Sequence, residues 1–147
     1  MSLEMLKTSL TNLGLQPVAE RTWTVLVVDD DPKAVEVLAA FLPIPAHAVV
    51  RAYGGSEAIM LAQRIRPDLI LLDLMMPEVS GFDVVKALHS NNETAHIPIL
   101  VVTAKQITAD DRSGLGKDKA AVIHIDGKAS LNQSYFIGEV RRALPQL

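Results

Sequence analysis

The chain has 147 residues and a net charge of −3, 49% of its residues are hydrophobic, and it contains no cysteine. This length suffices for one domain with a complete hydrophobic core. The lack of cysteine excludes disulfides and thiolate metal sites, and fits a reducing, cytoplasmic compartment. No apolar stretch approaches the roughly 20 residues of a membrane helix. The scattered basic residues argue against binding of nucleic acid or membranes by this chain.

The first 22 residues differ in pattern from the rest of the chain. Four leucines share one stripe of a predicted short helix over residues 3–13, which ends at Gly14. A linker containing Pro17 follows. We therefore expect residues 1–22 to be an inter-domain connector or a leader introduced for expression, and residues 23–147 to form the domain.

From residue 23 onward, predicted strands and helices alternate. The strands are short apolar runs of the kind found in buried parallel sheets, expected at residues 24–28, 48–51, 69–72, 97–102 and 121–125. Helices are expected to begin after Asp31, at residue 57, at Gly81, at a capping box of Thr108 with Asp111, and after Ser130 with Gln133. Five such strands alternating with five helices predict an α/β fold. We expect a flavodoxin-like, doubly wound parallel sheet of order 2-1-3-4-5 with helices on both faces.

Polar residues follow four of the predicted strands. Asp29 and Asp30 come after the first strand, Asp73 after the third and Thr103 after the fourth, and Lys128 lies just past the fifth. Ligands of such sheets bind at the carboxyl ends of the strands, where the strand order reverses, so we expect these side chains to converge. Clustered carboxylates repel one another, and a hard cation such as Mg²⁺ with oxygen ligands relieves that repulsion. A carboxylate can also act as a nucleophile and form an aspartyl phosphate.

Three motifs resemble those of response-regulator receiver domains of two-component signalling. They are VLVVDDDP at residues 25–32, PDLILLDLMMPEVSGF at residues 67–82 and IPILVVTAK at residues 97–105. The similarity covers about residues 23–144. It implies a phosphoryl-accepting signalling domain and not an enzyme. The phosphodonor would be the phosphohistidine of a histidine kinase or of a histidine phosphotransfer domain.

The resemblance also implies a role for each polar residue. Asp73 would be the phosphoacceptor. Asp30 and Asp73 would bind Mg²⁺ through their side chains, Asp29 mostly through water, and Met75 through its backbone carbonyl. Thr103 and Lys128 would bind the phosphoryl oxygens. Phosphorylation would then change the surface of the last two helices, which a downstream protein effector or a neighbouring domain reads.

Two features depart from the family pattern. The stretch from Thr103 to Lys128 is a few residues longer than usual, and we place the extra residues around Gly116–Lys119, which leaves Lys128 as the phosphoryl-binding lysine. Ile125 stands three residues before this lysine, where many receivers have Tyr or Phe. The sequence therefore lacks one part of the usual threonine–aromatic switch.

The larger protein and two rival functions also follow from sequence patterns. Residues 103–112 and 115–144 resemble receivers within hybrid sensor histidine kinases, so we expect such a parent, with a stand-alone response regulator as the alternative. Asp29-x-Asp31 after an apolar strand also resembles phosphatases of the haloacid-dehalogenase type, in which Asp29 would be the nucleophile. A misplaced Lys128 would instead indicate a pseudo-receiver that only binds proteins.

Overall fold

A computed structural model of the chain describes residues 23–103, 106–115, 120–124 and 132–144. The expected helix at residues 3–13 lies outside these ranges, as do Ile125 and Lys128. Within them, no helix is long and apolar enough to cross a membrane.

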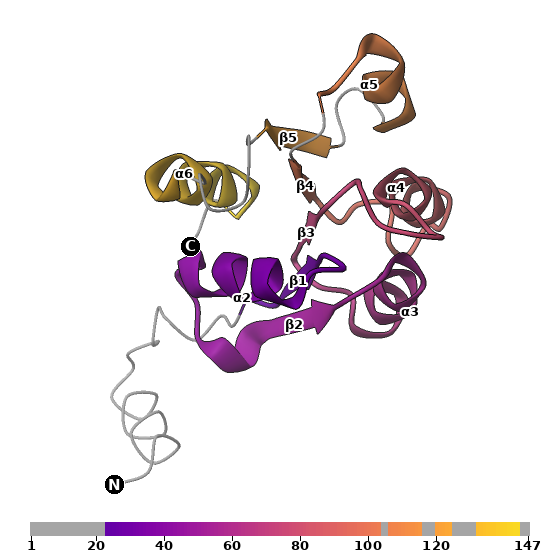
Figure 1. The fold of residues 1–147 in the computed structure, drawn as a ribbon. Helices are drawn as coiled ribbons and strands as arrows, with labels where there is room; N and C mark the ends of the chain where they lie inside the picture. The colour runs from indigo at the N-terminus through magenta and orange to yellow at the C-terminus, as the bar shows by residue number, and fades with distance from the viewer. Residues whose placement is uncertain (1–22, 104–105, 116–119, 125–131, 145–147) are drawn as a thin grey trace, which may run out of the picture.

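The described strands form one parallel sheet. They are β1 (Val25–Val28), β2 (Val49–Ala52), β3 (Leu69–Leu72), β4 (Ile99–Thr103) and β5 (Ala120–His124). Their order in the sheet is β2-β1-β3-β4-β5, and each neighbouring pair is parallel. This confirms the predicted doubly wound fold and its strand order (Figure 1).

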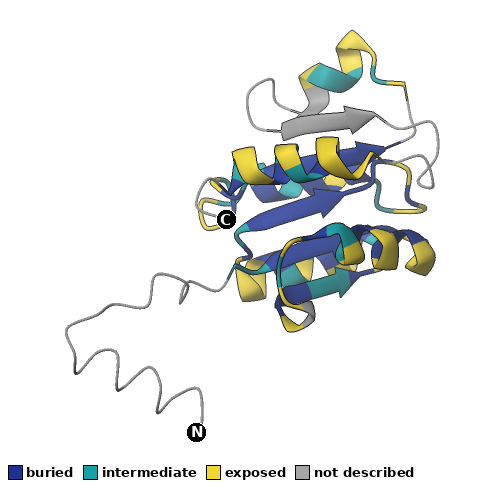
Figure 2. Ribbon diagram, turned by 90° about the vertical axis from the view of Figure 1, so that its left-hand side faces the viewer, coloured by how far each residue is buried: buried dark blue, intermediate teal, exposed yellow. Residues whose placement is uncertain are grey.

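Helices cover both faces of the sheet. They are α2 (Pro32–Phe41), α3 (Gly55–Ile65), α4 (Gly81–His89), α5 (Ala109–Leu115) and α6 (Gln133–Ala143), with a short 3-10 turn, η2 (Ala46–Ala48). Helices α3 and α4 pack on one face, and α2 and α6 pack on the other (Figure 1). Figure 2 shows the inner strands buried along their length, while the helices expose their outer faces. Burial of both faces explains why the strands are continuous apolar runs and do not alternate with polar residues.

The side chains of each inner strand divide between two hydrophobic clusters. On β3, Ile70 and Leu72 face α3 and α4, while Leu69 and Leu71 face α2 and α6. Phe136 of α6 is fully buried in the second cluster. Because successive side chains of a strand point to opposite faces, the central strands are clamped from both sides. The residues that follow these strands therefore start from fixed positions.

Helix α4 begins at Gly81 as expected, and two predicted helix caps are confirmed. The carboxylate of Asp31 accepts a hydrogen bond from the backbone N–H of Lys33 at 3.0 Å, and Pro32 is the first residue of α2. At α5, the N–H of Thr108 donates to Asp111 at 3.0 Å, and the N–H of Asp111 donates to Thr108 Oγ1 at 3.1 Å. Each cap satisfies backbone donors that the first helical turn leaves without a partner in the helix.

Several expected boundaries differ from the structure, and those of β1 and β2 differ by one residue. Helix α3 begins at Gly55, two residues before the expected start, and β4 begins at Ile99 and not at residue 97. The later start of β4 fits Pro98, which has no N–H to donate to a strand ladder. The expected cap of the last helix was wrong: Asn132 caps α6 by accepting from the N–H of Tyr135 at 2.9 Å. Asparagine caps as well as serine does and lies directly before the first helical residue.

Candidate functional site

Three carboxylates meet at the carboxyl edge of the sheet. Val28 of β1 pairs with Leu72 of β3, so the next residue of each strand, Asp29 and Asp73, emerges beside the other. Together with Asp30, these residues place one carboxylate oxygen each within 4.8 Å of the others. The predicted convergence of the three aspartates is therefore confirmed.

The three aspartates differ in their exposure to solvent. Asp29 and Asp73 are almost completely buried, with 1% and 5% of their surface exposed, whereas Asp30 is exposed. The site is thus a buried pair of carboxylates with a third at the solvent side. Solvent therefore reaches the cluster at Asp30.

Backbone amides orient the two buried carboxylates. The N–H of Asp31 donates to Oδ1 of Asp29 at 2.9 Å, and the N–H of Met75 donates to Oδ1 of Asp73 at 3.3 Å. The N–H groups of both buried aspartates in turn donate to carbonyls of the neighbouring strand at 3.1 Å. Each carboxylate is therefore fixed by the turn that follows it, and each turn is fixed by the sheet.

The donor set fits a hard divalent cation. Three carboxylate groups supply only oxygen ligands, and their atoms lie close enough together to share one ion. Mg²⁺ is usually held by one or two carboxylates, with water and a phosphate completing its shell. The exposed position of Asp30 leaves room for such water.

The other predicted site residues are Thr103, Met75 and Lys128, and the structure describes the first two of them. Thr103 is the last residue of β4 and fully buried, and since Val101 pairs with Leu72, it ends its strand one residue further along the same edge than Asp73. Met75 is 61% exposed, while Met76 packs into the core. The structure does not describe Lys128.

The loop from Asp73 to α4 has two features that were not predicted from the sequence. Glu78 has a φ of 66°, a left-handed conformation that costs a residue other than glycine some free energy. Ser80 caps α4 through a capping box, in which its Oγ accepts from the N–H of Asp83 at 3.3 Å and its own N–H donates to the Asp83 carboxylate at 3.0 Å. The Ser-x-x-Asp spacing was the available signal for this box.

Comparison with known families identifies the class of protein. The model of the response regulator receiver domain family matches residues 25–124, and the chain belongs to this family. A receiver domain is a phosphoacceptor of two-component signalling and not an enzyme, as expected, and this disfavours the phosphatase alternative. The cluster of Asp29, Asp30 and Asp73 is typical of the Mg²⁺ site of receivers.

Curated relatives agree with this family. The chain is 42% identical over 92 residues to the probable transcriptional regulatory protein TcrX of Mycobacterium tuberculosis, a match that covers 63% of this chain and 38% of TcrX. It is 36% identical over 86 residues to protein PilH of Pseudomonas aeruginosa, which covers 58% of this chain and 71% of PilH. It is also 36% identical over 88 residues to the polar-differentiation response regulator DivK of Brucella anthropi, covering 60% of this chain and 72% of DivK. The match thus spans most of PilH and DivK, but little more than a third of TcrX.

Solved structures agree on the fold. The chemotaxis protein CheY4 of Vibrio cholerae matches with a TM-score of 0.70 and 25% identity, over 84% of this chain and 99% of CheY4. The phosphorylated cyanobacterial phytochrome response regulator RcpA matches with a TM-score of 0.72 over 86% of this chain and 97% of RcpA, and at 23% identity it supports the fold alone.

These comparisons correct one expectation. The expected origin in a hybrid sensor kinase rested on residues 103–112 and 115–144. TcrX is described as a transcriptional regulatory protein and DivK as a response regulator, and none of the relatives named above is described as a hybrid kinase. The resemblance to receivers of hybrid kinases therefore gains no support, because features of the receiver fold are common to both groups.

Proposed function

We propose that the chain accepts a phosphoryl group on Asp73 from the phosphohistidine of a histidine kinase or a histidine phosphotransfer domain. The observation that carries this proposal is the carboxylate cluster, with three ligand oxygens within 4.8 Å at the carboxyl edge of a receiver fold. Asp73 is the buried member of this cluster that directly follows the central strand β3.

The transfer itself exchanges one bond to phosphorus for another. A carboxylate oxygen of Asp73 forms a bond to phosphorus while the bond from phosphorus to the donor imidazole nitrogen breaks, and the imidazole takes up a proton from water. The N–H of Met75 holds Oδ1 of Asp73 at 3.3 Å and so fixes the direction of the other oxygen. Mg²⁺, bound by Asp29, Asp30, Asp73 and the Met75 carbonyl, would neutralise part of the charge on the phosphoryl group.

Two further residues are proposed to bind the phosphoryl oxygens. The hydroxyl of Thr103 can donate a hydrogen bond, and its place at the end of β4 supports this role. The ammonium of Lys128 would supply a compact positive charge. The gain of phosphoryl charge would reorganise the loops after β3 and β4 and change the surface of α5 and α6, which a protein effector or a neighbouring domain would read.

Intact-mass measurement after incubation with acetyl phosphate and Mg²⁺ tests the acceptor. Wild type is expected to gain the mass of one phosphoryl group, and Asp73→Asn is expected to gain none. Asp68→Asn is a matched control, because Asp68 precedes the opposite end of β3 and its carboxylate accepts from the N–H of Thr24 at 2.9 Å. An adduct that persists at the same peptide in Asp73→Asn would overturn the assignment.

We also propose that this receiver works as a separate response regulator and not as a domain of a hybrid kinase. The support is the extent of the match, which covers 71% of PilH and 72% of DivK. The reading frame around the coding sequence tests this proposal. A continuous frame that also encodes a histidine kinase core would contradict it.

A further inference from the structure

The loop that follows Asp73, residues 74–80, contacts the first residues of two helices. Gly81 begins α4, and its N–H donates to the carbonyl of Leu74 at 3.1 Å, which closes the loop on itself. Gly55 begins α3, which lies beside α4 on the same face of the sheet (Figure 1), and it contacts Val79 near the far end of the loop. Val79 is partly buried against the hydrophobic cluster under these helices.

The contact at Gly55 leaves no room for a side chain. A Cβ atom at this position would lie 2.6 Å from Cγ1 and 2.7 Å from Cβ of Val79, and it would overlap the backbone carbonyl oxygen of Val79. Atoms do not approach this closely in folded proteins. A carbonyl oxygen cannot turn away as the end of a long side chain can, so the loop itself would have to move.

The preceding residue, Gly54, offers a direct contrast. Gly54 is the N-cap of α3 in an extended conformation, with a φ of −168° that any residue adopts. A Cβ atom at Gly54 would meet nothing within 4 Å. A side chain at Gly55 would therefore collide with the loop after Asp73, whereas a side chain at the adjacent Gly54 would not.

A displacement of Val79 would be transmitted toward the acceptor. On the other side of the loop, a Cβ at Gly81 would lie 2.6 Å from Cα of Leu74 and would overlap the carbonyl oxygen of Asp73, so the α4 side is already tightly packed. If Val79 moves, the residues of the loop that can move with it are therefore those from Met75 to Glu78. Met75 is the residue whose N–H orients the Asp73 carboxylate, and Glu78 is held in its left-handed conformation.

We propose that Gly55 is a positioning residue for the phosphoacceptor loop: its missing side chain lets Val79 seat against α3, and this seat holds Met75 in place beside Asp73. The proposal rests on the proposed function, in which the Met75 carbonyl and the Asp73 carboxylate bind Mg²⁺. Gly55 touches neither the metal nor the phosphoryl group and acts only through the loop.

Calorimetric titration with Mg²⁺ of Gly55→Ala, Gly54→Ala and wild type tests the proposal. Gly55→Ala is expected to weaken Mg²⁺ binding by about ten- to a hundredfold, the range seen when groups that orient metal ligands are lost. Gly54→Ala is expected to bind as wild type does, although alanine is a poorer N-cap than glycine and will lower stability slightly. Equal Mg²⁺ affinity in the Gly55 and Gly54 variants would overturn the proposal.

A second variant separates positioning from mere destabilisation. Asn132→Ala removes the cap of α6, which packs on the other face of the sheet, and so lowers stability without touching the loop. Positioning by Gly55 predicts that Asn132→Ala keeps the Mg²⁺ affinity of wild type while Gly55→Ala loses it. A purely structural role predicts that affinity and stability fall together. If Gly55→Ala does not fold, Val79→Gly is measured in its place, because it removes the side chain that seats against α3. Val79→Gly is then expected to weaken Mg²⁺ binding, and an affinity equal to that of wild type would overturn the proposal.

A metal-free measurement distinguishes this proposal from the proposed function. The amide signals of Met75 and Asp73 in nitrogen-15 spectra should shift in Gly55→Ala and stay in place in Gly54→Ala. Should wild type fail to bind Mg²⁺, the proposed function is wrong, and these signals still decide whether Gly55 positions the loop. Unchanged signals in Gly55→Ala overturn the positioning role whatever the metal does.

Discussion

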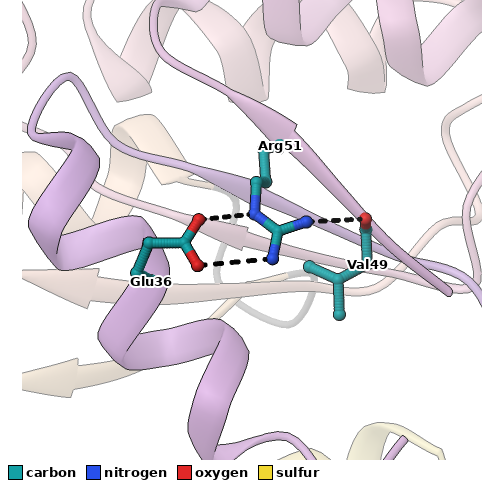
Figure 3. A network of polar contacts seen from close by, with 3 residues as sticks. All are labelled: Glu36, Val49 and Arg51. Carbon is teal, nitrogen blue, oxygen red and sulfur yellow. Dashed lines mark hydrogen bonds and ion pairs between the residues drawn. The ribbon is translucent and has the colours of Figure 1, made fainter. Parts of the chain in front are cut away.

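Arg51 on β2 and Glu36 on α2 are joined by a two-bonded ion pair between the sheet and a helix. Nε of Arg51 lies 2.6 Å from Oε1 of Glu36, and Nη2 lies 3.4 Å from Oε2 (Figure 3). The same guanidinium donates from Nη1 to the carbonyl of Val49 at 3.4 Å. The hydrogen bond to Glu36 raises the pKa of Arg51 above its ordinary value.

A double-mutant cycle of Glu36→Gln and Arg51→Met should give a small coupling free energy. The Arg51 side chain is 31% exposed and the Glu36 side chain is 60% exposed, and ion pairs at such positions contribute about 0.2–1 kcal/mol. Since the pKa of Arg51 is raised, its contribution would be lost only as the pH rises through that value, so the coupling should be constant from neutral to moderately alkaline pH. Urea denaturation of the four proteins measures it. A coupling free energy of zero would show that this ion pair does not contribute to the stability of the fold.

The capping box at the start of α4 should be worth as much as the cap of α6. Ser80→Ala removes the acceptor of the Asp83 N–H, and Asn132→Ala removes the acceptor of the Tyr135 N–H. Each should lower the free energy of unfolding by about 1 kcal/mol, measured by denaturant titration. Ser56→Ala, an exposed change within the first turn of α3, should stay within about 0.5 kcal/mol of wild type. A loss at Ser56 as large as that at Ser80 would argue against capping as the cause.

Neighbouring aspartates should respond differently to Mg²⁺. A ligand that binds only the folded state stabilises it by about 2.7 kcal/mol at a hundredfold excess over its dissociation constant. Asp30→Asn should lose most of this gain, because Asp30 belongs to the carboxylate cluster. Asp31→Asn should keep it, since Asp31 caps α2 and asparagine caps equally well. Thermal melts with and without Mg²⁺ make the comparison, and an equal response in both variants would remove Asp30 from the set of ligands.

Lys128 should matter for phosphorylation and not for the metal. Lys128→Ala is expected to bind Mg²⁺ nearly as wild type does but to lose the conformational response to phosphorylation, because the lysine would contact the phosphoryl group alone. Lys117→Ala and Lys119→Ala are the controls, since both lysines precede β5 in the sequence, whereas Lys128 follows it. Amide spectra with and without acetyl phosphate give the readout. The lysine assignment fails if a control loses the response while Lys128→Ala retains it.

The fold was predictable because its signals are local and strong. Leu69–Leu72 reads as a buried strand and is one, and Asp31 with Pro32 starts α2 as expected. The exact start of a helix was harder to predict, because neighbouring residues can each fill the cap or the first helical position. Asn132 took the cap expected of Ser130, and Gly55 entered α3 although glycine is a poor helix former.

The candidate site was predictable only in part. Strand ends in a doubly wound sheet converge, so the meeting of Asp29, Asp30 and Asp73 follows from topology. The bond from the Met75 N–H to Asp73 and the left-handed Glu78 do not, because they depend on how the loop packs against α3 and α4. The sequence pattern thus predicts which acidic residues meet, while tertiary contacts determine how their carboxylates are oriented.

The guanidinium of Arg51 also has a consequence for how molecules of this protein meet one another. Strand β2 is the outermost strand on its side of the sheet. The carbonyl of Ala52 points inward to Asp29, so by alternation that of Val49 points outward, toward any strand that might add to the sheet. Arg51 covers this carbonyl and is itself held by Glu36. A short border strand with one acceptor already engaged is a poor template for a second copy, which favours chains that stay apart at high concentration.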